Sequence, residues 1–484
     1  MRIRVPDNSA TPDYANTRTL IMNGDTAKNI NKRHPDSEEM LAIWEKCEDV
    51  REGQIAVHEA GNIYLPVLSG QSNAEYQAYK RRAVFYGAMS RTVDAFSGMI
   101  MRVPPSVDNQ SPYLDDVTGH DCSLAEFTGE VLEEVLVTGF GGILVEHSPM
   151  AKAVTLAQAQ AAGARPYLAL FDADSVINWR MDGKRITQLI LEEEEYIAKS
   201  EFEGEEQCFY RVLDLDELGN YRQRKFIEKD KYFVQVGDDI YPLMNGAYLK
   251  EIPFFFLGDA DELPLLIDLV DLNISHYMTT ADLENGCHFT GIPQPWLAGV
   301  QLPDGVTLSV GGVNAWVFPD PSAKAQYLEF SGQGLGALEK RLELKEKQMA
   351  ALGAKMLSDS VTAETATGAS LRSTGEFSVL AQLSDRVGKV LSRACSFMHQ
   401  WAGLQPVTIK LNTDYLPAKM TPQELQALVA AWQAGGISSM TLFNNLQQGE
   451  LIANGVTFEE EQAQIAEQAP ILVAPVASTA HVAQ

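Results

Sequence analysis

Two long helical patterns enclose a short segment rich in turn residues, and this order constrains the fold more than any other feature. Residues 263–287 and 334–357 carry apolar side chains at the three- and four-residue spacing of amphipathic helices. Between them, "IPQPWLAGVQLPDGVTLSVGGVNAWVFPDP" is interrupted by Pro and Gly, which predicts a small element of strands and loops. We therefore expect two helices that flank a small strand-and-loop element.

The second of these helices has one apolar face and one charged face. Its apolar stripe follows alternating spacings of four and three, with Lys345 as its charged member: Leu338, Leu342, Lys345, Met349, Leu352 and Met356. The first helix carries only acidic charges, at Asp268, Asp271, Asp282 and Glu284. This pattern fits two arrangements equally, an antiparallel hairpin within one core and a helix pair packed against copies of itself in a ring.

The sequence outside this helix pair mixes the two periodicities, which predicts an α+β fold. Helices are expected over residues 35–53, 74–101, 123–142 and 377–403 and in short stretches after 421, and two strands over 54–68. Ser123 and Glu126 have the spacing of a capping box. From 141 to 250, short β-like runs alternate with turn signals such as "ELGN" and "VGDD", which predicts a β-rich lobe.

A small, polar stretch, "SVTAETATGASLRSTGE" (360–376), separates the second helix from the next helical pattern. Thr, Ser and Gly disfavour a continuous helix, so the stretch predicts a flexible loop. We expect this loop to interrupt what would otherwise be one very long helix.

Charge is distributed very unevenly along the chain. The 484 residues carry a formal net charge of −27, which argues against binding the outside of DNA through basic patches. No Lys or Arg occurs between Glu251 and Ala323, which hold ten acidic residues, or from Met420 onward, where six Glu occur. A solvated acidic face and a shared functional surface both explain this separation.

Motifs for catalysis and cofactor binding are missing from the sequence. "TGFGGILVEH" has neither phosphate-loop spacing, and no Ser stands in a GxSxG motif. The five Cys show no CxxC spacing, and no apolar run is long enough for a membrane span. We therefore expect no catalytic, cofactor-binding or metal-binding residues, no cofactor and no membrane association.

The order of these elements resembles that of tailed-bacteriophage portal proteins. More specifically, the chain resembles a family of portal-like phage proteins first catalogued as a domain of unknown function. The resemblance spans roughly residues 35–415 and includes "EYQAYKRRAVFYGAMSRTVDAFSGMIMRVPP" and "LEEVLVTGFGGILVEHSP". All the matching stretches are 75–105, 132–149, 165–180, 263–299, 328–357 and 363–372.

This resemblance implies a division of the chain into successive parts. They are an N-terminal extension, an α/β wing that includes the β-rich lobe, a stem helix, a clip, a second stem helix, a tunnel loop, a long wing helix with a strand, a helical crown and a disordered tail. In this sequence they would be residues 1–34, 35–261, 262–288, 289–333, 334–358, 359–373, 374–419, 420–465 and 466–484.

The resemblance also implies a function without enzymatic activity. A dodecameric ring at one capsid vertex would let double-stranded DNA pass, without sequence preference, during packaging and ejection. The large terminase, the head–tail adaptor, and the major capsid and scaffolding proteins would be its partners, in the virion and, during assembly, in the host cytoplasm. The tunnel loop would present Thr362, Glu364, Thr365, Thr367, Ser370 and Arg372 to DNA, and Asp268, Asp271, Asp282 and Glu284 would be an acidic tunnel lining.

Two other functions remain as alternatives. One is another phage head–tail structural protein, such as an adaptor or a capsid component, although adaptors are usually much shorter. The other is a hydrolase, which would need an active site without any of the motifs sought above.

Overall fold

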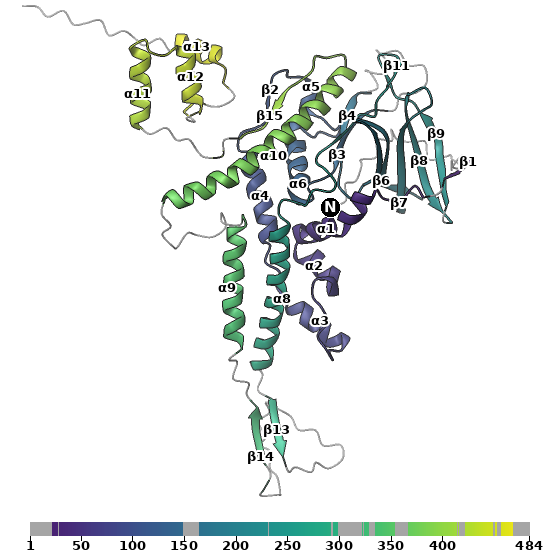
Figure 1. Cartoon of the computed structure of the whole chain (residues 1–484), viewed down its shortest axis with the longest axis vertical. Helices are drawn as coiled ribbons and strands as arrows, with labels where there is room; N and C mark the ends of the chain where they lie inside the picture. Colours follow the sequence, from purple (N-terminus) through teal and green to yellow (C-terminus); the bar gives the residue numbers. More distant parts are fainter. Residues whose placement is uncertain are drawn as a thin grey trace, which may run out of the picture. The chain divides into compact units, whose positions relative to one another are not determined.

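The computed structural model shows a chain of mixed helices and antiparallel strands (Figure 1). It describes residues 22–27, 29–148, 164–230, 232–291, 294–298, 322, 324–328, 334–353, 366–413, 415, 422–448, 451–452 and 456–467. Two compact units, Met1–Thr413 and Asp414–Gln484, divide the chain. The mixture of helix and sheet agrees with the predicted α+β class.

Helices dominate the first part of the chain and the end of the first unit. They are α1 (Pro35–Glu52), α2 (Gln54–Ala60), the short 3-10 helix η1 (Gly61–Ile63), α3 (Asn73–Arg82), α4 (Ala88–Ile100), α5 (Pro112–Asp115), α6 (Leu124–Val137), α8 (Ile267–Thr290), α9 (Leu335–Ala351) and α10 (Ala366–Trp401). The predicted capping box is present in α6, where Ser123 and Glu126 bond to each other's backbone N–H groups.

The prediction of two strands over residues 54–68 is wrong, because α2 and η1 occupy most of this stretch. Gln54 and His58, one helical turn apart, both bond to the backbone that follows α3. The Gln54 side chain accepts from the Phe85 N–H (3.3 Å), and His58 Nε2 lies 3.1 Å from the Ala83 carbonyl oxygen. A strand would hold the two residues roughly 13 Å apart, too far for both bonds.

The same contacts explain why the helix predicted over 74–101 is broken. The chain leaves the helical conformation at Ala83, after α3, and returns to it in α4. Because Ala83 and Phe85 are held by side chains of α2, the break comes from tertiary packing, which overrides the local helical preference of the sequence.

Two antiparallel sheets lie in the first unit. The smaller has the order β12–β3–β4 and the larger the order β1–β9–β8–β7–β6–β5; the remaining strands form two-stranded pairs. The strands are β1 (Met22–Ala27), β2 (Ser106–Val107), β3 (Gly142–His147), β4 (Pro166–Phe171), β5 (Val176–Asp182), β6 (Arg185–Ala198), β7 (Gly204–Leu215), β8 (Tyr221–Lys229), β9 (Tyr232–Ile240), β10 (Leu243–Met244), β11 (Ala247–Tyr248), β12 (Phe254–Phe256), β13 (Gln294–Ala298), β14 (Lys324–Leu328) and β15 (Ile409–Lys410).

Strands β3 to β11 all fall within residues 141–250, the region predicted to be β-rich. The turn predicted at "ELGN" joins β7 to β8, where Asp216 accepts hydrogen bonds from the Leu218 and Asn220 N–H groups (2.9 and 2.8 Å). The turn predicted at "VGDD" is wrong, because these residues lie within β9. Gly237 has a φ of 78° there, and the pairing with β8 shifts register, so the Gly marks a bulge.

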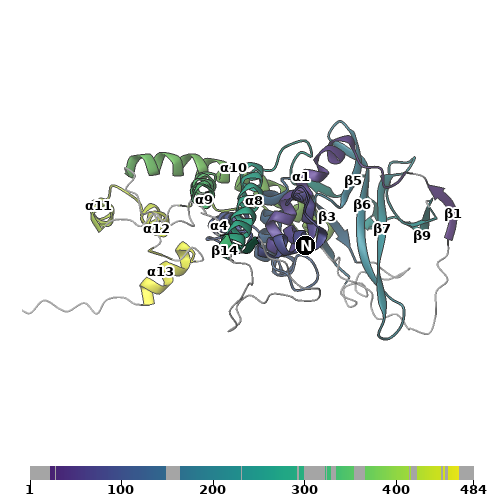
Figure 2. The same ribbon diagram turned by 90° about the horizontal axis from the view of Figure 1, so that it is seen from below.

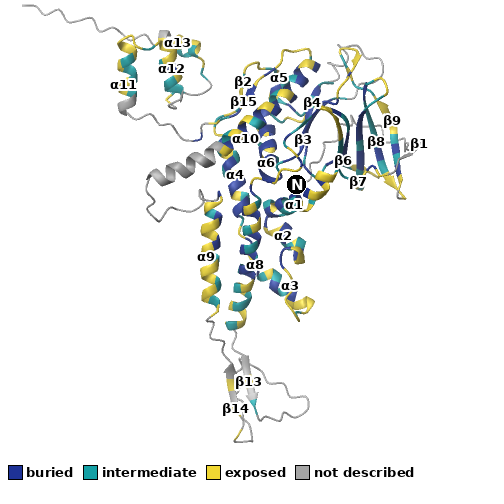
Figure 3. Ribbon diagram, in the orientation of Figure 1, coloured by how far each residue is buried: buried dark blue, intermediate teal, exposed yellow. Residues whose placement is uncertain are grey.

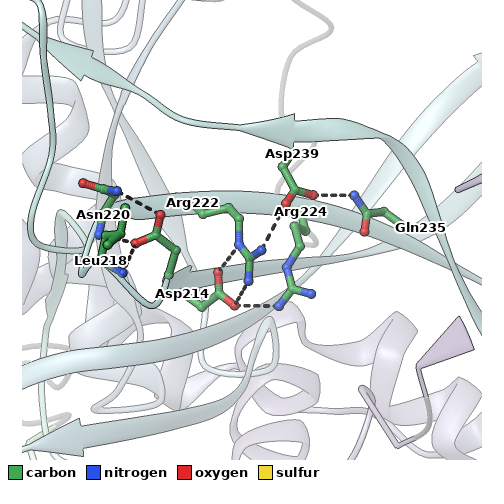
Figure 4. Close-up of polar contacts among 8 residues, drawn as sticks. Asp214, Leu218, Asn220, Arg222, Arg224, Gln235 and Asp239 are labelled. Carbon is green, nitrogen blue, oxygen red and sulfur yellow. Dashed lines mark hydrogen bonds and ion pairs between the residues drawn. The ribbon is translucent and has the colours of Figure 1, made fainter. Parts of the chain in front are cut away.

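A charged network fastens the three strands β7, β8 and β9 to one another (Figure 4). Asp214 accepts from Arg222 Nε (3.0 Å) and Nη2 (2.9 Å) and from Arg224 Nη2 (2.6 Å). Arg222 Nη1 also donates to Asp239 (3.1 Å), whose other oxygen accepts from Gln235 Nε2 (2.7 Å). Bidentate Arg–carboxylate pairing of this kind fixes strand register as well as adding energy.

A second network, buried more deeply, joins the two sheets. Arg211 on β7 is ion-paired with Glu146 on β3 and with Glu193 on β6 (2.6 Å). The Glu193 side chain is 1% exposed and that of Glu146 is 7% exposed. Tyr167 on β4 donates to the second oxygen of Glu146 (3.2 Å). One guanidinium group thus neutralises two carboxylates that water scarcely reaches.

A third group of charges, all acidic, lies where α1, α6 and the segment after β4 meet. Glu134 accepts from the Thr138 hydroxyl (2.6 Å) and from the Ala173 N–H (3.1 Å). Burial and the neighbouring Asp172 raise the pKa of Glu134 to about 8, and burial and the neighbouring carboxylates raise the pKa of Glu48 to about 9. Both groups are therefore protonated in the folded chain at pH values where the unfolded chain has lost the proton.

Folding stability should consequently fall as pH rises from about 4.5 toward 8 through these groups, because unfolding then releases protons. Glu134→Gln keeps both acceptor contacts and removes the titration. We expect the variant to be about 1 kcal/mol more stable than the parent at pH 8 and no more stable at pH 4.5. Urea unfolding at the two pH values measures this; an equal change at both would contradict the assignment.

The second unit is helical in the part that the structure describes. Its helices are α11 (Pro422–Gln433), α12 (Ser439–Gln448) and α13 (Phe458–Glu467), in agreement with the short helices predicted after residue 421. The rings of Phe443 and Phe458 meet edge to face with centroids 5.5 Å apart, which joins α12 to the start of α13.

Candidate functional site

Helices α8 and α9 pair in an antiparallel hairpin. This is one of the two arrangements that the sequence pattern predicts. The C-terminal part of α8 meets the start of α9 so closely that a Cβ atom on Gly286 would lie 2.6 Å from the Leu335 side chain. Further along, Lys345 of α9 lies beside Ser275 and Thr279 of α8. The two-stranded pair β13–β14 belongs to the segment between the helices.

Lys345 of α9 forms hydrogen bonds directly with α8. It is buried, and its ammonium group donates to the Ser275 carbonyl oxygen and to the Thr279 hydroxyl, both at 2.6 Å. Burial lowers the pKa of this lysine. Lys345, the charged member of the predicted apolar stripe, therefore anchors α9 to α8 through hydrogen bonds. The spacing of the stripe did not predict these bonds.

Replacing Lys345 with Ala should loosen the hairpin. Hydrogen bonds from a charged donor contribute about 1.5–3 kcal/mol, so we expect local opening of α8 and α9 to become roughly 30-fold easier. Hydrogen–deuterium exchange of the two helices measures this change. Lys347→Ala is the matched control, because Lys347 is exposed and should leave exchange unchanged. Equal exchange in both variants would show that Lys345 is not an anchor.

Helix α9 packs against little besides α8 among the residues that the structure describes. Lys345 and Met349 are its buried residues, while Leu344 and, directly after the helix, Leu352 are 51% and 42% exposed. Figure 3 shows α9 coloured mostly as exposed. A helix is normally stabilised by burying one face on its neighbours. The described residues therefore leave the face of α9 that points away from α8 uncovered.

The four acidic residues proposed as a tunnel lining fall into two groups. Asp271 pairs with Lys46 of α1 (2.6 Å), and Asp282 accepts from the Tyr79 hydroxyl of α3 (2.6 Å). Asp268 and Glu284 are exposed and have no partner among the residues that the structure describes. Since Asp268 and Glu284 point roughly 160° apart around the helix, the four carboxylates do not form one face.

The residues proposed for the tunnel loop are only partly described. Thr362, Glu364 and Thr365 lie outside the described residues. Thr367, Ser370 and Arg372 lie within α10, which begins at Ala366, so residues 366–373 are helical and their assignment to a loop is wrong. The apolar stripe of the helix, including Leu383, Val387 and Leu391, anchors its later turns. Extension of an anchored helix into a polar sequence costs little.

No cluster of three or more His, Cys, Asp or Glu could hold a metal ion among the described residues. A shallow pocket between β2 and β15 is lined by Ser106, Asp108, Thr408 and Lys410, and none of these is a His or Cys. Within the described helices, none has the length and apolar character needed to cross a membrane.

Comparisons with known proteins find one matching family model and several similar solved structures. Residues 264–402 match a family described as a domain of unknown function, DUF4055. This match contains α8, the β13–β14 segment, α9 and the whole of α10. No curated protein matches the chain.

Three solved structures are similar to the chain. A chain in the virion of a native gene transfer agent particle has 13% identity and a TM-score of 0.34, covering 80% of this chain and 96% of that one. A chain in the neck of the empty particle, computed with C6 symmetry, has 11% identity and a TM-score of 0.35, covering 82% and 95%. A chain in the neck of the native particle, computed with C12 symmetry, has 12% identity and a TM-score of 0.30, covering 79% and 96%.

Proposed function

We propose that the chain is a phage portal protein, a ring-forming channel for DNA at one vertex of the capsid. The observation that carries this proposal is the α8–α9 hairpin. Its helices flank the β13–β14 pair in the sequence, and α9 exposes most of its surface after packing on α8 (Figure 3). In a ring, the exposed face of α9 would be covered by the neighbouring subunit.

Charge on the hairpin supports a passage for DNA. Helix α8 lies wholly within the span Glu251–Ala323, which has no Lys or Arg. Each phosphate contact made by Lys or Arg adds affinity, and a row of such contacts would slow a moving duplex. An acidic wall instead repels the duplex and keeps it centred. Asp268 and Glu284 have no partner among the described residues, and because they point to nearly opposite sides of α8, only one of them can belong to that wall.

The remaining parts follow from the family resemblance. The stem would be α8 and α9, and the clip (289–333), which includes β13 and β14, would dock the large terminase and later the head–tail adaptor. The wing would be residues 35–261, and the helices of the second unit would form the crown. The tunnel loop would be limited to the residues before α10, with Arg372 on the first turns of that helix. Twelve subunits, contacts with the capsid and scaffolding proteins, and a place in the virion belong to the same proposal.

Deleting the gene from its parent phage tests this role. We expect capsids that contain no DNA, and full recovery of infectious particles when the chain is supplied from a plasmid. Capsids that fill with DNA but lack tails would point to a head–tail adaptor. Loss of capsids altogether would point to a capsid component, and either result would contradict the portal.

A further inference from the structure

The β6–β7 hairpin extends beyond the sheet to which it belongs. Strand β5 pairs with β6 only as far as Leu191, and β8 pairs with β7 only from Tyr210 onward. Glu193 and Phe209 at the base of this extension are buried, so the two-stranded arm that projects from the sheet is residues 196–206 (Figure 2). A two-stranded ribbon is marginally stable alone in water, so an arm of this length is better suited to a partner than to solvent.

The tip of this arm is an ordered turn that displays aromatic rings. The Lys199 and Ser200 N–H groups donate to the Glu203 carbonyl oxygen (2.8 and 3.0 Å), and the Ser200 hydroxyl accepts from the Glu203 N–H (3.1 Å). This closed turn leaves Phe202 87% exposed. Tyr196, on the adjoining strand, is 60% exposed. Exposed aromatic side chains on an ordered element are typical of a contact surface.

The tip is also acidic. Lys199 is ion-paired with Glu205, whereas Glu201 and Glu203 have no side-chain partner in the part of the chain that the structure describes. Two free carboxylates thus flank the exposed ring of Phe202. A partner surface with basic side chains and some apolar area would complement this tip.

The opposite end of the same sheet has that character. The end of β5 and the turn to β6 (residues 180–184, called the β5–β6 turn) carry Arg180 and Lys184, which are exposed and have no ion-pair partner among the described residues. With the exposed Asp182, residues 180–184 have a net charge of +1. Between Arg180 and Lys184, Met181 is 45% exposed. Because β6 is 14 residues long, this turn lies roughly 45 Å from the acidic tip. The two ends cannot meet within one chain, but they can meet between two copies.

We propose that the arm tip of one copy docks on the β5–β6 turn of the next copy. Phe202 would pack near Met181, while Glu201 and Glu203 would lie beside Arg180 and Lys184. The two surfaces differ, so the contact is head-to-tail, and repetition of such a contact gives either a closed ring or a filament. The expectation that this contact closes into a ring, and does not form a filament, rests on the proposed function.

Charge reversal of the tip tests the contact in the full-length chain. We expect Glu201→Lys/Glu203→Lys to weaken self-association at least tenfold, as measured by sedimentation velocity over a range of protein concentrations. Phe202→Ala should also weaken self-association. This variant should fold normally because the Phe202 ring is exposed. Glu38→Lys/Glu39→Lys is the matched control, since it changes net charge equally at exposed positions on α1 and should leave association unchanged.

A rescue experiment identifies the partner surface. Arg180→Glu/Lys184→Glu should weaken association as well, and a chain carrying all four reversals should regain it, because each contact again joins opposite charges. Failure of the fourfold variant to associate would overturn this pairing. Rings that persist unchanged in the tip variant would overturn the contact and leave the portal role standing. A parent chain that forms no oligomer would overturn both.

Discussion

Arg211→Ala should destabilise the first unit more than any other single substitution described for it. Among the described residues, Arg211 is the cation that is ion-paired with both Glu146 and Glu193. Removing it leaves two carboxylates without a counter-charge in a region of low dielectric. Breaking a buried ion pair from one side costs about 3–5 kcal/mol, and we expect the free energy of unfolding to fall by that amount.

The expected pH dependence of this variant has a definite sign. Burial already raises the pKa of Glu193 in the parent chain, and loss of Arg211 would raise it further. A carboxyl group with a raised pKa in the folded state contributes stability that is lost as pH rises above its ordinary value. The variant should therefore be closest to the parent near pH 4.5 and furthest from it near pH 8.

Urea unfolding of the variant and of a surface control measures both effects. The control is Lys199→Ala, which removes an ion pair that is about half exposed on each side. Exposed pairs contribute only about 0–1 kcal/mol, so this change should be small at every pH. A loss of stability for Arg211→Ala no larger than the control's would contradict the assignment of the network as a link between the two sheets.

Asp268→Lys/Glu284→Lys should reduce DNA packaging roughly tenfold or more. If α8 lines the passage, every subunit would then offer one cation to the phosphates of a moving duplex, from whichever of the two positions faces the DNA. Attraction at this position would retard the DNA, whereas the parent carboxylates repel it. The measurement is the amount of nuclease-protected DNA per particle in cells that supply the variant chain.

Two controls separate charge from other effects. Asp268→Asn/Glu284→Gln removes the repulsion without adding attraction, so its packaging defect should be much smaller. Glu38→Lys/Glu39→Lys makes the same charge change on α1, outside the proposed passage, and should package normally. Normal packaging by the α8 variant would exclude Asp268 and Glu284 as tunnel-facing residues.

Sequence periodicity predicts those parts of the fold that depend on local order. The α8–α9 pair, the β-rich region and the cap of α6 were all evident from spacing, because each is specified by neighbouring residues. The secondary-structure predictions that were wrong have a common cause, because tertiary contacts decide the structure of those residues. Residues 54–68 look like strands until the bonds of Gln54 and His58 to the segment after α3 are known.

The candidate site shows the same limit. The acidic character of α8 follows from the sequence. Which of its carboxylates have partners does not, because Asp271 and Asp282 contact Lys46 and Tyr79, which are distant in the chain. In the sequence, Lys345 is a charged interruption of an apolar stripe. Its hydrogen bond to the Ser275 carbonyl oxygen of α8 becomes evident only from the structure. The Arg211 network needs the register of strands from two sheets and has no local signal at all.

Negative-stain electron microscopy of the purified full-length chain tests the proposed ring most directly. We expect closed rings with a central hole wide enough for a DNA duplex, together with a sedimentation coefficient that shows a single large oligomer. A chain that remains monomeric at every protein concentration and ionic strength tested, with no rings on the grid, would contradict the proposed portal function.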